Sequence, residues 1–235
     1  MKNAVILING LGLGNSTRCK VLIDWLISKN FEITILTSGN GKDYFKYNNY
    51  KIIPLKQIDY DKKNGKLSIF KLILNLINII KIVQINSTNI NNVIKKVNAD
   101  LIISDSIYFF PGKDFKKRNS VALNNSNLII RYFFRFKKKP INIYPQFFLI
   151  ELFDYLISKF VYKKIWSPVI SINDLKKNNK NNKNNKKIFF LPPISRFKNN
   201  FIKVESSEIK NICVMLSGSS FKTKVFFSKI NLDKY

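Results

Sequence analysis

The amino-acid sequence predicts an α/β fold built on a doubly wound, mostly parallel sheet with helices on both faces. Short apolar runs of strand length recur along the chain, and longer segments with helical periodicity separate them. The first strand is followed at once by a glycine-rich loop and a helix pattern. Strands that alternate with helices favour parallel pairing, because each helical crossover returns the chain to the same end of the sheet.

The first strand, its loop and its helix form the most informative unit. Residues 4–8 (AVILI) are apolar and indicate a buried strand, and residues 10–14 (GLGLG) follow directly. Asn15, Ser16 and Thr17 offer capping side chains to a helix over residues 19–27. This corner directs free N–H groups and a positive helix end at one point, which predicts an anion site. A tight turn without a ligand is the alternative.

The other elements are predicted from the same two periodicities. Strand patterns fall at residues 31–37, 50–55, 100–104, 120–123, 169–172, 188–191 and 209–216. Helical patterns cover residues 67–97 and 146–166, and the Lys- and Asn-rich residues 176–187 predict a solvated loop. The apolar face of the helix over 67–97 is unusually wide. We interpret it as a core helix; the alternative is an interfacial surface that docks on an anionic bilayer.

Composition excludes several classes of chemistry. The chain of 235 residues has no histidine, which excludes Ser-His-Asp and Cys-His catalysis. Cys19 and Cys213 lie far apart in apolar segments and predict buried, reduced thiols, and no cluster of metal ligands is present. The N-terminal apolar run is broken by Asn9 and glycines, which indicates a strand rather than a signal peptide. We therefore expect a cytoplasmic protein without a metal or cofactor.

The charge balance admits two interpretations. The net charge is +27, which is typical of proteins that bind nucleic acid or an anionic membrane. However, the chain is rich in Lys, Asn, Ile, Phe and Tyr, the residues that an AT-rich genome over-supplies. Many of the lysines are thus equally well explained as compositional drift on a solvated surface.

The glycine-rich loop departs from two familiar nucleotide motifs. A dinucleotide fingerprint needs a third glycine where Asn15 stands, and it needs an acidic residue where the second strand ends in Thr37-Ser38-Gly39. No Walker A pattern is present either. A nicotinamide-dependent enzyme and a P-loop NTPase are therefore not predicted.

Residues 9–41 resemble the opening of two-domain GT-B glycosyltransferases related to the family of the peptidoglycan N-acetylglucosaminyltransferase. In that group a glycine-rich loop, a Ser/Thr-Arg pair and a helix precede a strand of the form E-x-T-x-L-T. Residues 101–106 (LIISDS), 191–196 (LPPISR) and 212–220 (ICVMLSGSS) resemble later segments of the family in the same order. Where the family commonly has a histidine in the first loop, this chain has Asn15.

The resemblance implies a domain plan and two binding sites. It implies an acceptor-side Rossmann-like domain over residues 1–191, a linker over 192–208 and the truncated start of a donor-side domain over 209–235. The acceptor site would comprise Gly10, Gly12, Gly14, Asn15, Ser16, Thr17 and Arg18. The donor loop would comprise Ser217, Gly218, Ser219 and Ser220. Helix capping by Ser16 and Thr17, and a surface position for Arg18, are the alternatives.

Glycosyl transfer needs a base for the acceptor hydroxyl, and without histidine this base must be a carboxylate. Asp105 follows a predicted strand at its carboxyl end, where open α/β sheets bind their ligands, so we predict it to be the catalytic base. Capping of a following helix is the alternative role for Asp105.

These observations predict a cell-envelope glycosyltransferase, or its N-terminal part, that transfers a sugar from a nucleotide sugar to a saccharide or lipid-linked acceptor. A UDP-sugar is the expected donor, and the chain alone is expected to be inactive. The first alternative is a non-catalytic subunit that docks on the inner face of the cell membrane and presents the acceptor to a separate donor-domain chain. The second is a basic nucleic-acid-binding α/β domain, although no recognised RNA or DNA motif supports a nucleic-acid partner.

Overall fold

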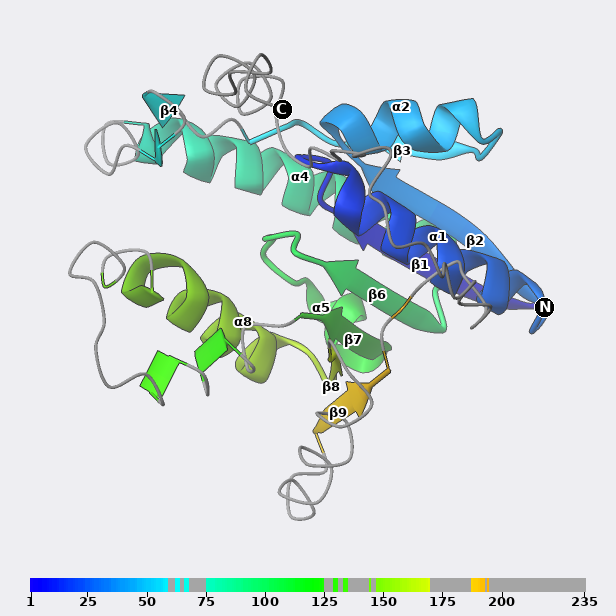
Figure 1. The fold of residues 1–235 in the computed structure, drawn as a ribbon. Coiled ribbons are helices and arrows are strands. Elements are labelled where there is room, and N and C mark those ends of the chain that lie inside the picture. The colour runs from blue at the N-terminus through cyan, green and yellow to red at the C-terminus, as the bar shows by residue number, and fades with distance from the viewer. Residues whose placement is uncertain are drawn as a thin grey trace, which may run out of the picture.

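The computed structural model describes residues 1–58, 62–63, 66–67, 75–124, 129–130, 133–134, 144, 147–169, 187–192 and 194. These residues contain a seven-stranded sheet in the order β3-β2-β1-β6-β7-β8-β9, with every neighbouring pair parallel (Figure 1). The strands are β1 (Lys2–Ile8), β2 (Phe31–Thr37), β3 (Ile52–Pro54), β6 (Leu101–Asp105), β7 (Asn119–Leu123), β8 (Lys164–Pro168) and β9 (Ile188–Leu191). The doubly wound parallel sheet predicted from the sequence is confirmed.

Helices cover both faces of this sheet. The helices are α1 (Leu13–Ile27), α2 (Gly39–Tyr47), α4 (Leu76–Lys96), α5 (Lys113–Lys117) and α8 (Leu152–Val161), the last preceded by a π-helical turn, η1 (Phe147–Glu151). A two-stranded antiparallel sheet pairs β4 (Lys62–Lys63) with β5 (Lys66–Leu67). None of the described helices combines the length and apolar character needed to cross a bilayer.

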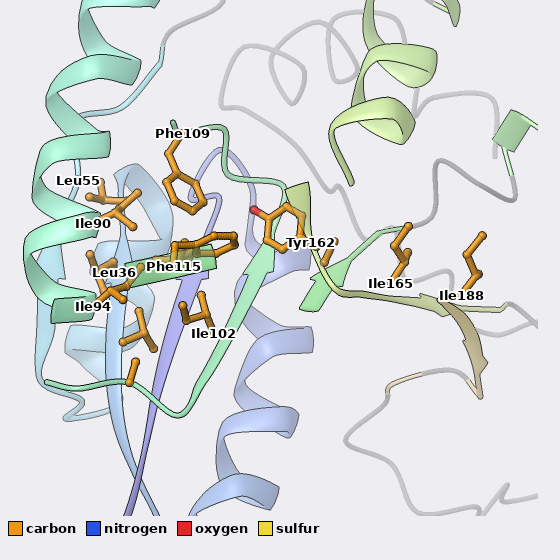
Figure 2. Close-up of a cluster of buried hydrophobic side chains, with 14 of the residues drawn as sticks. Leu36, Leu55, Ile90, Ile94, Ile102, Phe109, Phe115, Tyr162, Ile165 and Ile188 are labelled. Atoms are coloured by element: carbon orange, nitrogen blue, oxygen red, sulfur yellow. The ribbon is translucent and has the colours of Figure 1, made fainter. Parts of the chain in front are cut away.

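The period of two along each strand divides the core into two layers. Ile6 and Ile35 point to one face, where they pack against Ile23 of α1 and Phe45 of α2. Leu7 on the other face belongs to a cluster that packs against α4, α5 and the end of α8. Figure 2 shows Leu36 and Ile102 of this cluster beside Ile94 of α4. Because β1 is buried on both sides, its continuous apolar run is explained.

The boundaries of several predicted elements are corrected. Helix α1 begins at Leu13 rather than at residue 19, so that Gly14 and Asn15 lie in its first turn. The backbone N–H groups of a first turn have no intrahelical partner in any helix, so these two residues can occupy it. Helix α4 begins at Leu76, and Leu67, where the predicted helix would begin, belongs to β5. Residues 68–74 lie outside the described residues.

The largest error in the sequence prediction concerns residues 146–172. The predicted helix over 146–166 ends at Val161, and the strand expected at 169–172 is found earlier, as β8 (Lys164–Pro168). Short apolar runs satisfy either period, so Ile165 and Trp166 were assigned to the helix. Residues 170–172 lie outside the described residues.

Helices α2 and α5 were not predicted. Helix α2 contains Gly39 and Gly41, which are poor helix formers, and it is held in place by the fully buried Phe45. Packing against the sheet thus overrides a weak local preference. The predicted strand at 209–216 lies outside the described residues, and so does the linker apart from Pro192 and Ile194. The domain boundaries stay predictions.

Helix α4 changes character along its length. Its C-terminal half buries Ile90 and Ile94 in the core, as expected of a core helix. Its N-terminal half exposes Leu76, Ile77, Ile80 and Ile85, with Ile77 68% exposed. The wide apolar face predicted from the sequence therefore serves the core only in part.

Candidate functional site

The candidate site lies where β1 and β6 end side by side at the carboxyl edge of the sheet. From β1 the chain crosses over α1 to β2 on one side, whereas β6 leads to β7 on the other side. This is the switch point of the sheet, where open α/β folds form a ligand crevice. The sequence pattern had located the site here from the glycine-rich loop and from Asp105.

Asn9 joins the ends of the two strands. Its backbone N–H donates to the Asp105 carbonyl at 3.0 Å, and its side-chain Nδ2 donates to the Ser106 carbonyl, also at 3.0 Å. Its Oδ1 accepts from the backbone N–H of Leu11 at 3.0 Å. Ser106 has a φ of 58°, an uncommon value for a residue other than glycine, so its position is fixed against a local backbone cost. The edge is therefore rigidly defined at this point.

The glycines of the loop have different roles. A Cβ at Gly10 would lie 1.5 Å from the Ser38 carbonyl oxygen, so Gly10 allows the loop after β1 to pack against the loop after β2. A Cβ at Gly12 or Gly14 would meet nothing within 4 Å. Of the three predicted acceptor-binding glycines, only Gly12 and Gly14 therefore leave open space for a ligand.

The N-terminus of α1 has no side-chain cap. Its N-cap residue is Gly12, so the predicted capping by Asn15, Ser16 and Thr17 is wrong, because these residues lie inside the helix. Thr17 donates to the Gly14 carbonyl at 3.1 Å, and the buried Ser16 Oγ has no hydrogen-bond partner among the described residues. The first-turn N–H groups are thus available to an anion or a polar ligand.

Arg18 and Asp105 form a buried ion pair behind the loop. Arg18 Nη2 lies 2.6 Å from Asp105 Oδ1, and Arg18 Nε lies 3.0 Å from Oδ2. Cys19 Sγ donates to the same Oδ2 at 3.3 Å, and the Asp105 side chain is fully buried, whereas the Arg18 side chain is 22% exposed. Burial raises the pKa of the Asp105 carboxyl, and Arg18 acts in the opposite direction. Burial also raises the pKa of the Cys19 thiol, which makes it unreactive.

This arrangement bears on two predictions for the site. Arg18 reaches inward to Asp105 rather than outward to an acceptor phosphate. Both oxygens of Asp105 are engaged, so the geometry favours a positioning role that ties α1 to β6. A catalytic role for Asp105 stays a prediction. The donor-loop residues Ser217, Gly218, Ser219 and Ser220 lie outside the described residues.

A small crevice that was not predicted from the sequence adjoins the loop. Its polar lining comes from Asn9, Ser38, Gln57, Asn86, Ser106 and Tyr108, and Leu11, Ile58 and Ile107 contribute apolar surface. Asn86 of α4 holds the segment after β3 by two hydrogen bonds of 2.9 Å, to the backbone N–H and carbonyl of Lys56. Next to it, Gln57 Oε1 is buried without a hydrogen-bond partner among the described residues. The sequence signal that could have identified Gln57 as a site residue is its position just after a predicted strand.

The chain matches one family model, described as glycosyl transferase family 1, over residues 3–132, which is more than half of its length. No curated protein sequence matches it. Solved structures that are similar include MurG from Acinetobacter baumannii, with 12% identity, a TM-score of 0.42 and coverage of 72% of this chain and 41% of that chain. Apo UGT2 from Phytolacca americana has 9% identity, a TM-score of 0.49 and coverage of 84% and 53%. The UDP-GlcNAc 2-epimerase from Methanocaldococcus jannaschii has 14% identity, a TM-score of 0.39 and coverage of 81% and 45%. The chain thus spans about half or less of the length of each of these proteins.

Proposed function

Since the chain belongs to glycosyl transferase family 1, we propose that the described domain binds the acceptor for glycosyl transfer from a nucleotide sugar. The acceptor is a saccharide or a lipid-linked saccharide, and the donor is a UDP-sugar. The observation that carries this proposal is the crevice at the switch point, where Asn9 and Ser106 fix two strand ends beside the uncapped end of α1. Polar groups of this kind pair with sugar hydroxyls.

The chemistry of glycosyl transfer determines which groups the acceptor side and the donor side of such an enzyme must supply. An acceptor hydroxyl oxygen attacks the anomeric carbon of the donor, and the bond from that carbon to the diphosphate oxygen breaks. The nucleoside diphosphate leaves with the electron pair, and the hydroxyl proton passes to a base. Positive charge or helix N-termini stabilise the leaving diphosphate. The acceptor side therefore supplies orientation and a base, whereas the donor side supplies diphosphate binding.

We assign the donor to a second domain, which either begins at residue 209 and contains the loop at Ser217, Gly218, Ser219 and Ser220 or belongs to a separate chain. We therefore expect the described domain to bind the acceptor and the nucleotide sugar to bind outside it.

Titrations monitored by backbone-amide NMR on the full chain test this assignment. Methyl β-glucoside and methyl N-acetyl-β-glucosaminide should shift the signals of Asn9, Gln57 and Ser106. UDP-glucose and UDP-N-acetylglucosamine should bind no more tightly than about 1 mM. The variant Gln57→Ala should weaken saccharide binding, whereas Gln84→Ala, at an exposed position of α4, should not. Tight binding of a UDP-sugar at the glycine-rich loop, or the absence of any saccharide response, contradicts the proposal.

We also propose that the domain works as a peripheral protein on the cytoplasmic, anionic face of the cell membrane. The supporting observation is the group of exposed apolar side chains at the N-terminal end of α4, Leu76, Ile77 and Ile80, in a chain of net charge +27. An exposed apolar helix end on a cationic protein is suited to the boundary between lipid headgroups and acyl chains. Docking of this kind would bring the crevice to a lipid-linked acceptor.

A further inference from the structure

The N-terminal half of α4 has two apolar faces, only one of which is the exposed face described above. Leu76, Ile77 and Ile80 belong to the exposed face. Residues spaced by three or four positions share the other face and line a groove: Asn75, Asn78, Ile79, Ile82 and Ile85. In Figure 1 this half of the helix projects beyond the ends of the strands. Helix α4 therefore forms one wall of a groove, which we call the α4 groove, outside the core.

The segment after β3 forms the opposite wall of the α4 groove. Lys56 and Gln57 of this segment line the groove, and both also line the crevice beside the glycine-rich loop. The backbone of Lys56 is fixed by Asn86 of α4, whose side chain accepts from its N–H and donates to its carbonyl, both at 2.9 Å. The groove and the crevice thus meet at Lys56 and Gln57, where the chain is held against α4.

The two spaces differ greatly in size. The crevice beside the glycine-rich loop has a volume of about 20 Å³, which is room for about one or two water molecules. The α4 groove has a volume of about 430 Å³, within the range of small-molecule binding sites. The crevice therefore admits a hydroxyl group rather than a whole sugar ring. A ligand that places a hydroxyl there has space for its remaining atoms in the adjoining groove.

The lining of the α4 groove combines cations with apolar surface. Lys81 lies about 8 Å before Asn86 along the helix axis, and Asn86 holds Lys56, so both ammonium groups can reach one anion. Three isoleucines cover about 9 Å along the same axis: Ile79, Ile82 and Ile85. Ammonium groups pair with phosphate oxygens, and isoleucine side chains take up an alkyl chain. A ligand that has both parts matches this lining.

We propose that the α4 groove binds a phosphate ester of an apolar alcohol, and that the acceptor sugar is the second substituent of that phosphate. Lys56 and Lys81 bind the phosphate, the three isoleucines contact the alkyl chain, and the sugar extends past Gln57 so that a hydroxyl enters the crevice. This inference rests on the proposed function, and it assigns the acceptor to the lipid-linked class rather than to free saccharides.

The position of the groove on α4 also favours a lipid. The groove ends at Asn75, which is followed directly by the exposed Leu76 and Ile77. If this helix end contacts a bilayer, as proposed above, an alkyl chain can pass from the bilayer into the groove along continuous apolar surface. The exposed face and the groove face then act on the same lipid.

Titrations of the full chain, monitored by backbone-amide NMR, test the inference with three soluble probes. Hexyl phosphate should bind about tenfold more tightly than methyl phosphate, because its chain covers apolar surface of the groove. It should shift the signals of Lys56 and Ile82 more than that of Lys46, an exposed lysine of α2. Hexyl glucosyl phosphate should also shift Asn9 and Ser106. This joined probe should bind at least tenfold more tightly than hexyl phosphate or methyl glucoside.

Variants separate the groove from the general positive charge of the chain. Lys56→Gln and Lys81→Gln, both at exposed positions, should each weaken the binding of hexyl phosphate by roughly fivefold. Lys46→Gln makes the same change in charge and should have no effect. Ile82→Ser should remove the advantage of hexyl over methyl phosphate, whereas Ile27→Ser, at an exposed position of α1, should preserve it. The wild-type comparison of the two phosphates decides the matter if Ile82→Ser does not fold.

The outcomes distinguish this inference from the proposed function. Equal affinities for hexyl and methyl phosphate, or equal weakening by Lys46→Gln and Lys56→Gln, would show binding through net charge alone and overturn the inference. It also fails if the joined probe has no advantage over hexyl phosphate, because the groove and the crevice then do not form one site. In both cases the proposed function stands as long as methyl glucoside shifts Asn9, Gln57 and Ser106. If no saccharide shifts these signals, the proposed function fails, whatever the phosphates do.

Discussion

At the scale of single residues, Gly10 gives the clearest separation between a packing role and a binding role. A Cβ at this position would lie 1.5 Å from a backbone oxygen, which can move only if the loop moves. We expect Gly10→Ala to lower the free energy of unfolding by about 1–3 kcal/mol or more. Urea unfolding followed by circular dichroism measures the change.

The matched control is Gly14→Ala, in the same loop region but within the first turn of α1. A Cβ there meets nothing within 4 Å, and alanine favours the helix. We expect the free energy of unfolding to stay the same or rise by up to about 1 kcal/mol. Equal destabilisation by the two alanines would show that the close approach of Ser38 to Gly10 is not a constraint.

The Arg18–Asp105 pair predicts an asymmetry between its two members. Arg18→Met leaves a fully buried carboxylate without its cation, and we expect a loss of about 3–5 kcal/mol at neutral pH. Asp105→Asn leaves a guanidinium that is 22% exposed and still reaches water, so its cost should be smaller. The two variants are compared by urea unfolding at one pH. A larger loss in Asp105→Asn would contradict this account of the pair.

At the scale of elements, we predict that a polar residue packed against α8 contributes more to stability than an aromatic residue of α8 itself, which is the reverse of what the sequence alone suggests. Asn124→Ala removes the donor that serves both Asp154 and Ser158, and we expect it to lower the free energy of unfolding by about 1–3 kcal/mol. Phe160→Ser changes an outward side chain and should alter that free energy by less than about 0.5 kcal/mol. Thermal unfolding of the two variants gives the comparison. A large loss of unfolding free energy in Phe160→Ser would mean that the exposed side of α8 around Phe160 is covered.

The same helix shows where prediction from sequence stops. The strands β1, β2 and β6 were predicted to within two residues at each end, because continuous or alternating apolar runs are strong local signals. The glycine-rich corner and Asp105 were also placed at the correct edge of the sheet. By contrast, the pairing of Asn124 with Asp154 joins residues 30 apart in sequence, and no local pattern encodes it.

Side-chain direction was the other quantity that the sequence could not provide. Asp105 and Arg18 were both expected to face a ligand, but they contact each other instead, although they are 87 positions apart in the sequence. Likewise, Gln57 in the segment after β3 and Asn86 of α4 line one crevice, although they are distant in sequence. Contacts between distant segments thus decided which of the candidate residues face a common space.

At the scale of the whole molecule, the net positive charge and the exposed apolar side chains at the N-terminal end of α4 predict salt-dependent membrane binding. We expect the chain to sediment with phosphatidylglycerol vesicles at low salt and to be released as salt rises, because the Debye length is about 10 Å at 0.1 M. Ile77→Ser combined with Ile80→Ser should weaken this binding, since both side chains are exposed. Lys46→Ser on α2 is the control for a small change in charge. Equal recovery in the supernatant with phosphatidylcholine and phosphatidylglycerol vesicles would count against docking.

The central position of β1 has a consequence for synthesis on the ribosome. Residues Lys2 to Ile8 of β1 pair with β2 on one side. On the other side β1 can pair only after β6 has been made, about 100 residues further along the chain. At about 5–20 residues per second, one edge of an apolar strand stays open for roughly 5–20 seconds while the intervening segment is made. An open apolar edge invites pairing with other chains. The nascent protein should therefore depend on chaperones during this interval, and faster elongation up to residue 105 should raise its soluble yield.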